Sequence, residues 1–244
     1  MRLLEAAPRE VEPIEAYGRL RRLGPRRPGL RLNMIAAVDG AAAVEGRSGA
    51  LGGPADKTLF GLLRSLADVI LVGAGTVRTE GYGPVRLDDD ARSRREEWGL
   101  PSVPPIAVVT RACRLDWESP FFTEAEQPPL IVTVASAPAA DRERAASVAD
   151  VIVAGDTEVD FREVVGALAA LGHDNVLAEG GPAVAAELAA AGLLDEVCLT
   201  LSPLLTAGDA HRILYGAPLA PPVSLSLVHV LEADGYLFLR YRRK

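Results

Sequence analysis

Residues 175–197 read NVLAEGGPAVAAELAAAGLLDEV. A short apolar run over 175–178 ends in the letters EGGP at 179–182, and an alanine-rich helical pattern follows over 183–191. Pro182 is tolerated in the first turn of a helix, because its missing N–H would have no partner there. The stretch therefore predicts a strand, a tight turn and a helix, the repeating unit of an α/β sheet.

The residues at this turn suit an anionic ligand. Gly180 and Gly181 have no side chains and let a ligand approach the backbone, while free N–H groups at the helix start carry partial positive charge. The turn predicts a cradle for a phosphate or pyrophosphate, although a plain strand-to-helix turn explains the two glycines equally well. Glu179 slightly favours the ligand-binding alternative. A carboxylate beside a bound anion is unfavourable, so Glu179 would have to face a different group of the same ligand.

Similar apolar runs recur along the chain with helical patterns between them. Several runs are apolar at nearly every position, as expected of strands buried on both faces of a sheet. The predicted strands are 30–38, 69–73, 106–110, 130–134, 151–153, 175–178 and 197–201, and the predicted helices are 55–66, 138–148, 160–171 and 183–191. This alternation predicts an α/β fold with helices on both faces of the sheet.

The two ends of the chain depart from that alternation. Residues 223–243 alternate with period two in two runs around the letters EADG, which predicts a C-terminal antiparallel hairpin. Residues 1–29 form a basic arm in which 13–23 has the pattern of a short amphipathic helix. Residues 81–104 predict a long loop with a charged helix at 88–98. No repeat or linker divides the rest, so we expect one domain over 30–244.

The composition excludes several classes of function. The 244 residues are 49% hydrophobic and 24% charged, enough for one sizeable core. The formal net charge of -7 gives no support for binding nucleic acid. The two cysteines are far apart and the three histidines lack metal-ligand spacing, so no disulfide framework and no metal is expected. No signal-peptide core or membrane-length run occurs, and we expect a cytoplasmic protein without a membrane partner.

A second junction resembles the first. DVILVGAGTVRTEGYGP, residues 68–84, runs from an apolar strand into Gly73 and Gly75, with Thr76 as a helix cap. The complete G-x-G-x-x-G spacing is absent. Two such strand ends predict a ligand lying across the carboxyl edges of several strands. Thr110 and Arg111 follow another strand and suit a phosphate, although Arg111 taken alone is better explained as a solvated surface residue.

Two polar residues in the first strand complete the candidates. Asp39 ends the apolar run just before Gly40, which predicts either an Asp-Gly turn or an acid facing the ligand. Asn33 lies within the same run and needs a hydrogen-bond partner if it is buried.

Three stretches together resemble the riboflavin-biosynthesis pyrimidine reductases. They are RLNMIAAVDGAA at 31–42, GRSGALGGPADKTLFGLLRSLADVILVGAGTVRTEGYGP at 46–84, and VLAEGGPAVAAELAAAGLLDEVCLTLSPLLTAG at 176–208. The resemblance implies a dihydrofolate-reductase-like, three-layer α/β/α fold with a mixed, mostly parallel sheet. It also implies NADPH as hydride donor, a homodimer, and a ribosylaminopyrimidine 5′-phosphate substrate whose ribosyl group is reduced to ribityl. No zinc deaminase signature precedes residue 31, so we expect a reductase only.

The resemblance also implies roles for individual residues. Asp39 would orient the pyrimidine or stabilise an iminium, and Glu179 would bind a polar substrate group. The implied substrate-binding residues are Asn33, Ser48, Arg64, Glu80 and Arg86. The implied cofactor-binding residues are Gly73, Gly75, Thr76, Thr110, Arg111, Gly180, Gly181 and Pro182. The family's D-D-P-x-L-T-x-R segment appears here as TEGYGPVR, so Glu80 replaces its first acid and Arg86 its phosphate-binding arginine.

Two rival functions fit the same sequence. A dihydrofolate or other dihydropteridine reductase keeps the chemistry but leaves Arg64 and Arg86 without an anionic partner on the substrate. A regulatory protein that binds NADPH without turnover belongs to another class. Offering pyrimidine and pterin substrates with NADPH separates the three.

Overall fold

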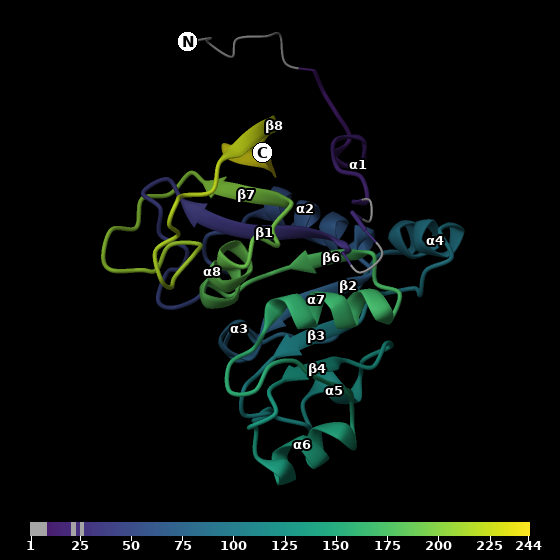
Figure 1. Ribbon diagram of the computed structural model, residues 1–244. Coiled ribbons are helices and arrows are strands. Elements are labelled where there is room, and N and C mark those ends of the chain that lie inside the picture. The colour runs from purple at the N-terminus through teal and green to yellow at the C-terminus, as the bar shows by residue number, and fades with distance from the viewer. Residues whose placement is uncertain (1–8, 21–22, 25–26) are drawn as a thin grey trace.

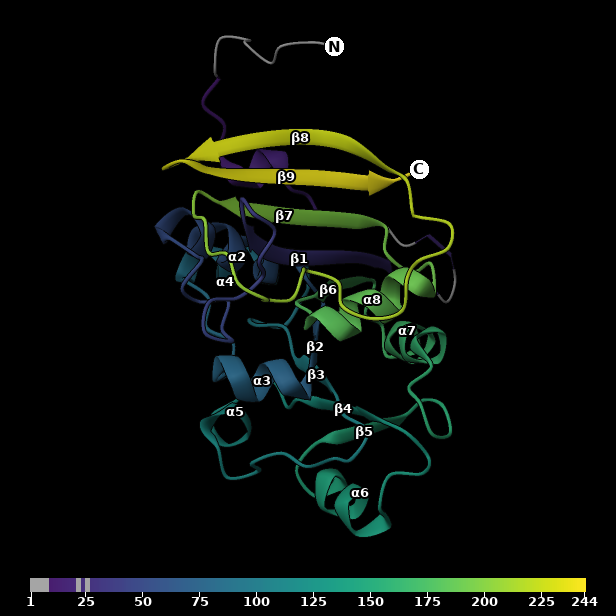
Figure 2. The same ribbon diagram turned by 90° about the vertical axis from the view of Figure 1, so that its left-hand side faces the viewer.

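One mixed sheet of nine strands forms the centre of the molecule (Figures 1 and 2). The computed structural model describes residues 9–20, 23–24 and 27–244. The strand order is β5-β4-β3-β2-β6-β1-β7-β9-β8. The strands are β1 (Gly29–Ala37), β2 (Val69–Gly73), β3 (Ile106–Val109), β4 (Leu130–Thr133), β5 (Asp150–Val153), β6 (Asn175–Ala178), β7 (Glu196–Ser202), β8 (Leu225–Ala233) and β9 (Tyr236–Arg243).

The predicted strands and hairpin are confirmed. Strands β1 to β7 coincide with the seven apolar runs and pair in parallel. Strand β9 pairs antiparallel with both β7 and β8, so the hairpin closes one edge of the sheet. Its turn lies at Asp234 and Gly235, whose φ angles of 54° and 81° are in the left-handed region that an Asp-Gly hairpin turn uses.

The helices lie on both faces of the sheet (Figure 1). All four predicted helices occur, as α2 (Pro54–Leu66), α6 (Ala139–Ala146), α7 (Phe161–Ala170) and α8 (Pro182–Ala190), and the charged helix is α4 (Asp89–Glu97). Three short helices complete the set: α1 (Pro13–Ala16) lies within the predicted N-terminal helix, α3 (Ala74–Glu80) follows the second glycine junction, and α5 (Pro120–Thr123) was not predicted. The cap predicted at Thr76 is wrong, because α3 begins two residues earlier and Gly73 is its N-cap.

Strand β2 shows why the central runs are apolar throughout. Ile70 and Val72 belong to a core cluster with residues of α2, whereas Val69 and Leu71 belong to a second cluster with residues of α7 and α8. Alternate side chains of one strand therefore enter opposite cores, so neither face can be polar. The predicted three-layer fold is confirmed.

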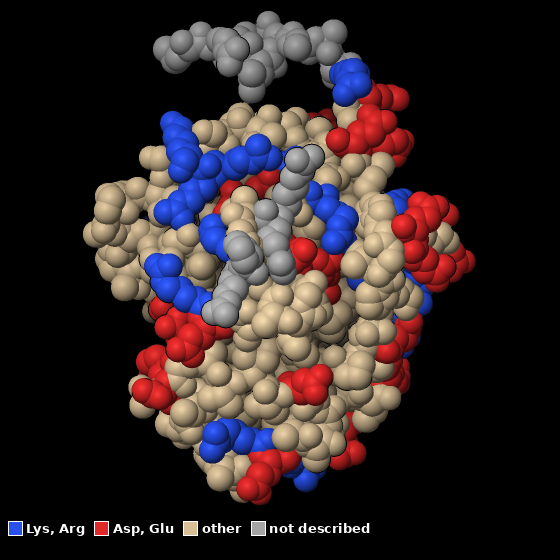
Figure 3. All heavy atoms as spheres, turned by 45° about the vertical axis from the view of Figure 1, so that its right-hand side comes forward, with Lys and Arg blue, Asp and Glu red and all other residues tan. Residues whose placement is uncertain are grey.

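The N-terminal arm packs against the sheet near the hairpin. Helix α1 has four residues where the sequence predicted a helix over 13–23, of which 21–22 lie outside the described residues. Tyr17 is fully buried, and Arg31 and Arg240 donate to the Gly18 and Ala16 carbonyls. On the face shown in Figure 3, Lys and Arg side chains gather mostly in the upper half, although the whole chain is acidic.

Candidate active site

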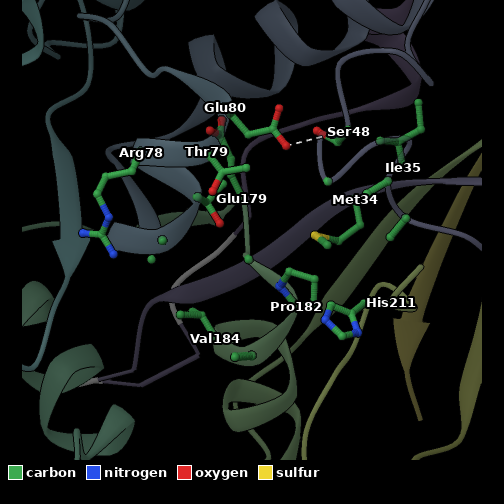
Figure 4. A pocket seen from close by; sticks show the side chains of 18 of the residues that line it. Met34, Ile35, Ser48, Arg78, Thr79, Glu80, Glu179, Pro182, Val184 and His211 are labelled. Carbon is green, nitrogen blue, oxygen red and sulfur yellow. Dashed lines mark hydrogen bonds between the residues drawn. The ribbon is translucent and has the colours of Figure 1, made fainter. Parts of the chain in front are cut away.

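A cleft of about 1930 Å³ lies at the carboxyl ends of the central parallel strands. Its walls come from the ends of β1, β2 and β3, the loop at 42–52, helices α2, α3 and α8, and the loop at 206–211 (Figure 4). Open α/β sheets bind ligands at this edge, because neighbouring loops separate there. The cleft therefore lies where the two glycine junctions predicted a ligand.

The two glycine junctions pack against each other at the floor of this cleft. The Gly73 N–H donates to the Gly180 carbonyl oxygen at 2.9 Å. A Cβ on Gly181 would lie 2.5 Å from the Thr76 hydroxyl, and a Cβ on Gly180, at φ 83°, would lie 3.0 Å from the Met34 sulfur. Side chains are excluded at Gly180 and Gly181 because β1, α3 and the β6–α8 turn meet there. The glycines serve this packing as well as any ligand.

The next positions along each junction are open to the cleft. A Cβ on Gly75 would meet no atom within 4 Å. Gly181 is the N-cap of α8 and Pro182 its first residue, as predicted, and Gly181 to Val184 line the cleft. The first N–H groups of a helix have no partner within the helix. This end of the cleft therefore offers backbone donors at close range.

Three arginines line the cleft around its α3 end. They are Arg78 on α3 and Arg111 and Arg114 after β3, and Thr110 lines the cleft beside them. Arg111 pairs with Glu158 at 2.7 Å, but the two side chains are 64% and 74% exposed. Such an exposed pair contributes little, so an incoming anion can replace the carboxylate.

Glu179 is a buried carboxylate held in a fixed orientation. It is 6% exposed, and Arg64 donates from Nε to Oε1 and from Nη2 to Oε2, both at 2.7 Å. The Tyr82 hydroxyl donates to Oε2 at 2.7 Å. Each carboxylate oxygen can accept two hydrogen bonds, so Oε1 retains an acceptor position. Glu179 also lines the cleft.

The charges of this centre support one another. Burial alone would lower the pKa of Arg64, but the charge and hydrogen bonds of Glu179 outweigh burial and raise that pKa. Burial, followed by the negative charge of Glu179, raises the pKa of Tyr82 well above its usual range. Tyr82 therefore stays protonated as a donor, and Arg64 stays charged.

The structure differs from the sequence prediction for Arg64. We expected Arg64 to face the substrate, but its Nε–Nη2 edge binds Glu179 and it does not line the cleft. Its guanidinium lies 4.1 Å from the centre of the Phe60 ring. Tyr82 was missed by the sequence analysis, and its only signal was an aromatic residue between two glycines in EGYGP.

A second carboxylate, Glu80, lies at the opposite wall from α8. The Ser48 N–H donates to Glu80 Oε1 at 2.8 Å, which ties the loop at 42–52 to α3 (Figure 4). Ser48 and Glu80 line the cleft, as does Asn33 from β1. The structure therefore brings three of the five predicted substrate-binding residues to the cleft.

Asp39 and Arg86 are not brought to the cleft. The Asp39 carboxylate accepts from the N–H groups of Thr206 and Ala207 at 2.8 and 2.7 Å, and the Ala207 bond is the main cause of its lowered pKa. Asp39 thus fixes the loop at 206–211, as the Asp-Gly turn alternative allows. Arg86 is 62% exposed, does not line the cleft, and pairs with Glu124 and Glu126.

Several lining residues were not identified from the sequence. They include Asp56 and Phe60 on α2, Arg78 and Arg114 among the cations, and His211, whose ring lies 4.0 Å from that of Tyr215. Among the described residues, no group of three His, Cys, Asp or Glu side chains is placed to hold a metal ion. No described helix is long and apolar enough to cross a membrane.

The parallel sheet, the edge hairpin and the cleft at the strand ends define a protein of the dihydrofolate-reductase-like fold class. Dihydrofolate reductase from Enterococcus faecalis, solved with NADP(H), superposes with a TM-score of 0.51 at 15% identity, over 88% of this chain and 96% of that one. At this identity the match shows the fold alone.

Residues 28–237 match the RibD C-terminal domain, and the chain belongs to that family. A 2,5-diamino-6-ribosylamino-4(3H)-pyrimidinone 5′-phosphate reductase from Methanothermobacter thermautotrophicus is 30% identical over 197 residues, 78% of this chain and 85% of the relative. A pyrimidine reductase-like protein from Corynebacterium diphtheriae superposes with a TM-score of 0.79 at 26% identity, covering 89% of this chain and 92% of that one.

Proposed function

We propose that this protein is an NADPH-dependent reductase that converts the ribosyl group of a ribosylaminopyrimidine 5′-phosphate to ribityl, in riboflavin biosynthesis. The observation that carries the proposal is the buried Glu179–Arg64–Tyr82 centre, which lies beside a cleft of about 1930 Å³ in a chain of the RibD C-terminal domain family. Pockets for one small ligand typically measure about 300–1,000 Å³. This cleft has room for a dinucleotide and a second molecule.

The cofactor fits the half of the cleft between α3 and α8. Backbone groups around Gly75 and the N-terminus of α8 suit the phosphates, because they offer open space and N–H donors. Arg78, Arg111 and Arg114 supply cations for the 2′-phosphate that distinguishes NADPH from NADH. Arg78→Ala with Arg111→Ala should raise KM for NADPH about tenfold or more and leave KM for NADH nearly unchanged. Equal effects on both cofactors would contradict this placement.

The substrate fits the other half, between α2, the loop at 42–52 and the loop at 206–211. Bound NADPH would supply a hydride to the ribosyl carbon in its open-chain imine form, and the imine nitrogen takes up a proton to give the amine. Glu179 accepts a hydrogen bond from a polar substrate group through Oε1, and Arg64 and Tyr82 hold the carboxylate still. Glu80 uses Oε1 for the Ser48 N–H and presents its other oxygen to the substrate.

The test is NADPH oxidation by the purified protein, followed by absorbance. The 2,5-diamino pyrimidinone phosphate, its deaminated uracil counterpart and dihydrofolate are offered separately. Turnover of either pyrimidine supports the proposal, and identification of the ribityl product completes it. Preference for dihydrofolate would contradict the proposal in favour of a pterin reductase, and NADPH binding without turnover of any of the three would contradict it in favour of a regulatory protein.

We also propose a homodimer formed through the C-terminal hairpin. Strand β8 is an edge strand that leaves large apolar side chains exposed, namely Leu225, Leu227, Val228 and Val230, and Leu237 of β9 is exposed beside them. A long apolar edge strand is a liability in a monomer unless another chain covers it. Light scattering should give twice the chain mass, and Leu227→Lys with Val230→Lys should give the monomer mass. A wild-type monomer at micromolar concentration would contradict the dimer.

A further inference from the structure

Three carboxylates line the cleft without being fully exposed, and they differ in how they are bound. Glu179 is held by Arg64 and Tyr82, and Glu80 accepts the Ser48 N–H. Asp56, in the first turn of α2, has no ion-pair partner within 4 Å among the described residues. Within that described part of the chain, the hydroxyl of Thr200 on β7 is the one side-chain group that favours its ionised form. Asp56 is therefore the half-buried acid of the cleft with the greatest acceptor capacity left for a ligand.

The backbone around Asp56 leaves space for its carboxylate. A Cβ on Gly52 would lie 2.7 Å from Asp56 Oδ2, so a side chain at position 52 would force the carboxylate to move. Thr200 of β7 is 2% exposed, and its hydroxyl partly offsets the effect of burial on the Asp56 carboxylate. Burial raises the pKa of Asp56, which means that the ionised group has lost part of its hydration and gains from new donors.

Helix α2 arranges two cleft residues and the arginine that holds Glu179 in a row. Asp56, Phe60 and Arg64 are four residues apart and share one face of the helix, about 6 Å between successive residues along the axis. Asp56 and Phe60 line the cleft, and Arg64 holds Glu179. A flat ring lying along Phe60 would therefore have one edge at Asp56 and its opposite side toward Glu179.

We propose that Asp56 selects the 2-amino form of the pyrimidine substrate; this deepens the proposed function and rests on it. In a 2-amino-4(3H)-pyrimidinone the N3–H and the 2-amino group are adjacent parallel donors, which match the two oxygens of a carboxylate. In the deaminated uracil form an oxo group replaces the 2-amino group and turns its lone pairs toward the carboxylate. Asp56 is therefore a specificity-determining residue, and Phe60 supports the ring between Asp56 and the reaction centre.

The experiment compares kcat/KM for the two pyrimidine phosphates in wild type and in Asp56→Asn. Wild type should prefer the 2,5-diamino substrate. The asparagine amide offers one acceptor and one donor, which suits the N3–H and 2-oxo pair of the uracil. The ratio of kcat/KM for the diamino form to that for the uracil form should fall about 100-fold, with kcat for the uracil form retained. A ratio that stays within threefold of wild type would overturn the inference.

Two further variants make the result unambiguous. Asp89→Asn removes a carboxylate from the first turn of α4, outside the cleft, and should leave the ratio unchanged. If Asp56→Asn does not fold, Asp56→Ser serves in its place and should lose the preference for the diamino form without gaining one for the uracil. Wild-type turnover of a pyrimidine with no change of ratio in the variants would overturn the role of Asp56 alone. Wild-type inactivity with both pyrimidines would overturn the proposed function as well.

Discussion

Two buried glutamates, Glu179 and Glu196, are each bound by arginine, yet their surroundings differ. Glu196 is 1% exposed and accepts five hydrogen bonds, from Arg31 and Arg240 twice each and from Arg242 once. It lies where β1, β7 and β9 meet, away from the cleft. Glu179 accepts three hydrogen bonds and faces the cleft. One carboxylate is saturated and the other keeps acceptor capacity.

The two buried carboxylates therefore serve different purposes, one in stability and one in the site. A buried ion pair is no guarantee of stability, because removing two charges from water costs about as much as their attraction returns. At Glu196 the excess of cations also binds the N-terminal arm, since Arg31 and Arg240 donate to arm carbonyls. At Glu179 the single arginine fixes the acid and leaves one side for a ligand. We therefore expect changes at Glu196 to affect stability and changes at Glu179 to affect turnover.

The largest expected effect is that of Glu196→Gln. The Arg31 and Arg240 side chains, 4% and 11% exposed, lose their counter-charge, and this should lower the free energy of unfolding by about 3–5 kcal/mol. The melting temperature should fall by about 10 °C. Denaturant unfolding measures the free energy of unfolding, and calorimetry measures the melting temperature. Loss of turnover at unchanged stability would reverse the comparison between the two glutamates.

The pH dependence of stability should report on the ion pairs of Glu196. Hydrogen bonds and charges from Arg240 and Arg31 outweigh burial and lower the pKa of Glu196 from 4.5 to about 2. A carboxyl group with a lowered folded-state pKa stabilises the fold above pH 4.5 and loses that contribution as pH falls toward 2. This contribution amounts to about 3 kcal/mol. Denaturation at pH 7, 4 and 2.5 should show the gap between wild type and Glu196→Gln shrinking. A difference in unfolding free energy that does not change with pH would contradict this assignment of the Glu196 pKa.

Glu179→Gln should lower kcat/KM with NADPH about 100-fold, or roughly 2.7 kcal/mol of transition-state stabilisation. Its cost in stability should stay near 1–2 kcal/mol, because Arg64 lies beside the cleft, 14% exposed, and its guanidinium can recruit water. Turnover and denaturant unfolding are measured on the same preparation. Retained turnover with a large loss of stability would show that Glu179 is as structural as Glu196.

Much of the fold could be predicted from the sequence, because strands buried on both faces are apolar at every position. β2 and β6 have no exposed residue, and the sequence predicted both as buried strands. The site was harder, because the partner of a charge is not encoded locally. Arg64 and Glu179 are 115 residues apart, and only the fold shows that they neutralise each other. Asp56 has the sequence pattern of an ordinary acid in a first helical turn.

Arg86 and Asp39 show the opposite failure. Asp39 was singled out at a strand end and Arg86 by matching a family motif to TEGYGPVR, but Asp39 binds the loop at 206–211 and Arg86 lies at the surface. Tyr82 occupies a position in that same altered segment and reaches Glu179 instead. The same segment therefore leaves Arg86 at the surface and supplies Tyr82 to the site.

Tyr82→Phe tests the contact between Tyr82 and Glu179, and its expected effect is smaller. Loss of the hydroxyl removes one of the three donors to Glu179, and kcat/KM should fall about tenfold through looser positioning of the carboxylate. Stability should change by about 1 kcal/mol or less. Tyr241→Phe on β9, outside the cleft, is the matched control and should leave turnover unchanged. Equal turnover in both variants would remove Tyr82 from the site.

The smallest expected effect is that of Arg242→Gln. This variant tests whether the exposed hydrogen bond to Glu196 contributes to stability. The Arg242 side chain is 60% exposed, whereas that of Arg240 is 11% exposed, although both donate to the same carboxylate oxygen. Water replaces an exposed donor easily, so Arg242→Gln should cost less than about 1 kcal/mol in denaturant unfolding. Arg240→Gln should cost about 3 kcal/mol or more, because a buried acceptor and the Ala16 carbonyl lose their donor together. Similar costs for both variants would mean that total charge around Glu196, and not buried hydrogen bonding, stabilises this end of the sheet.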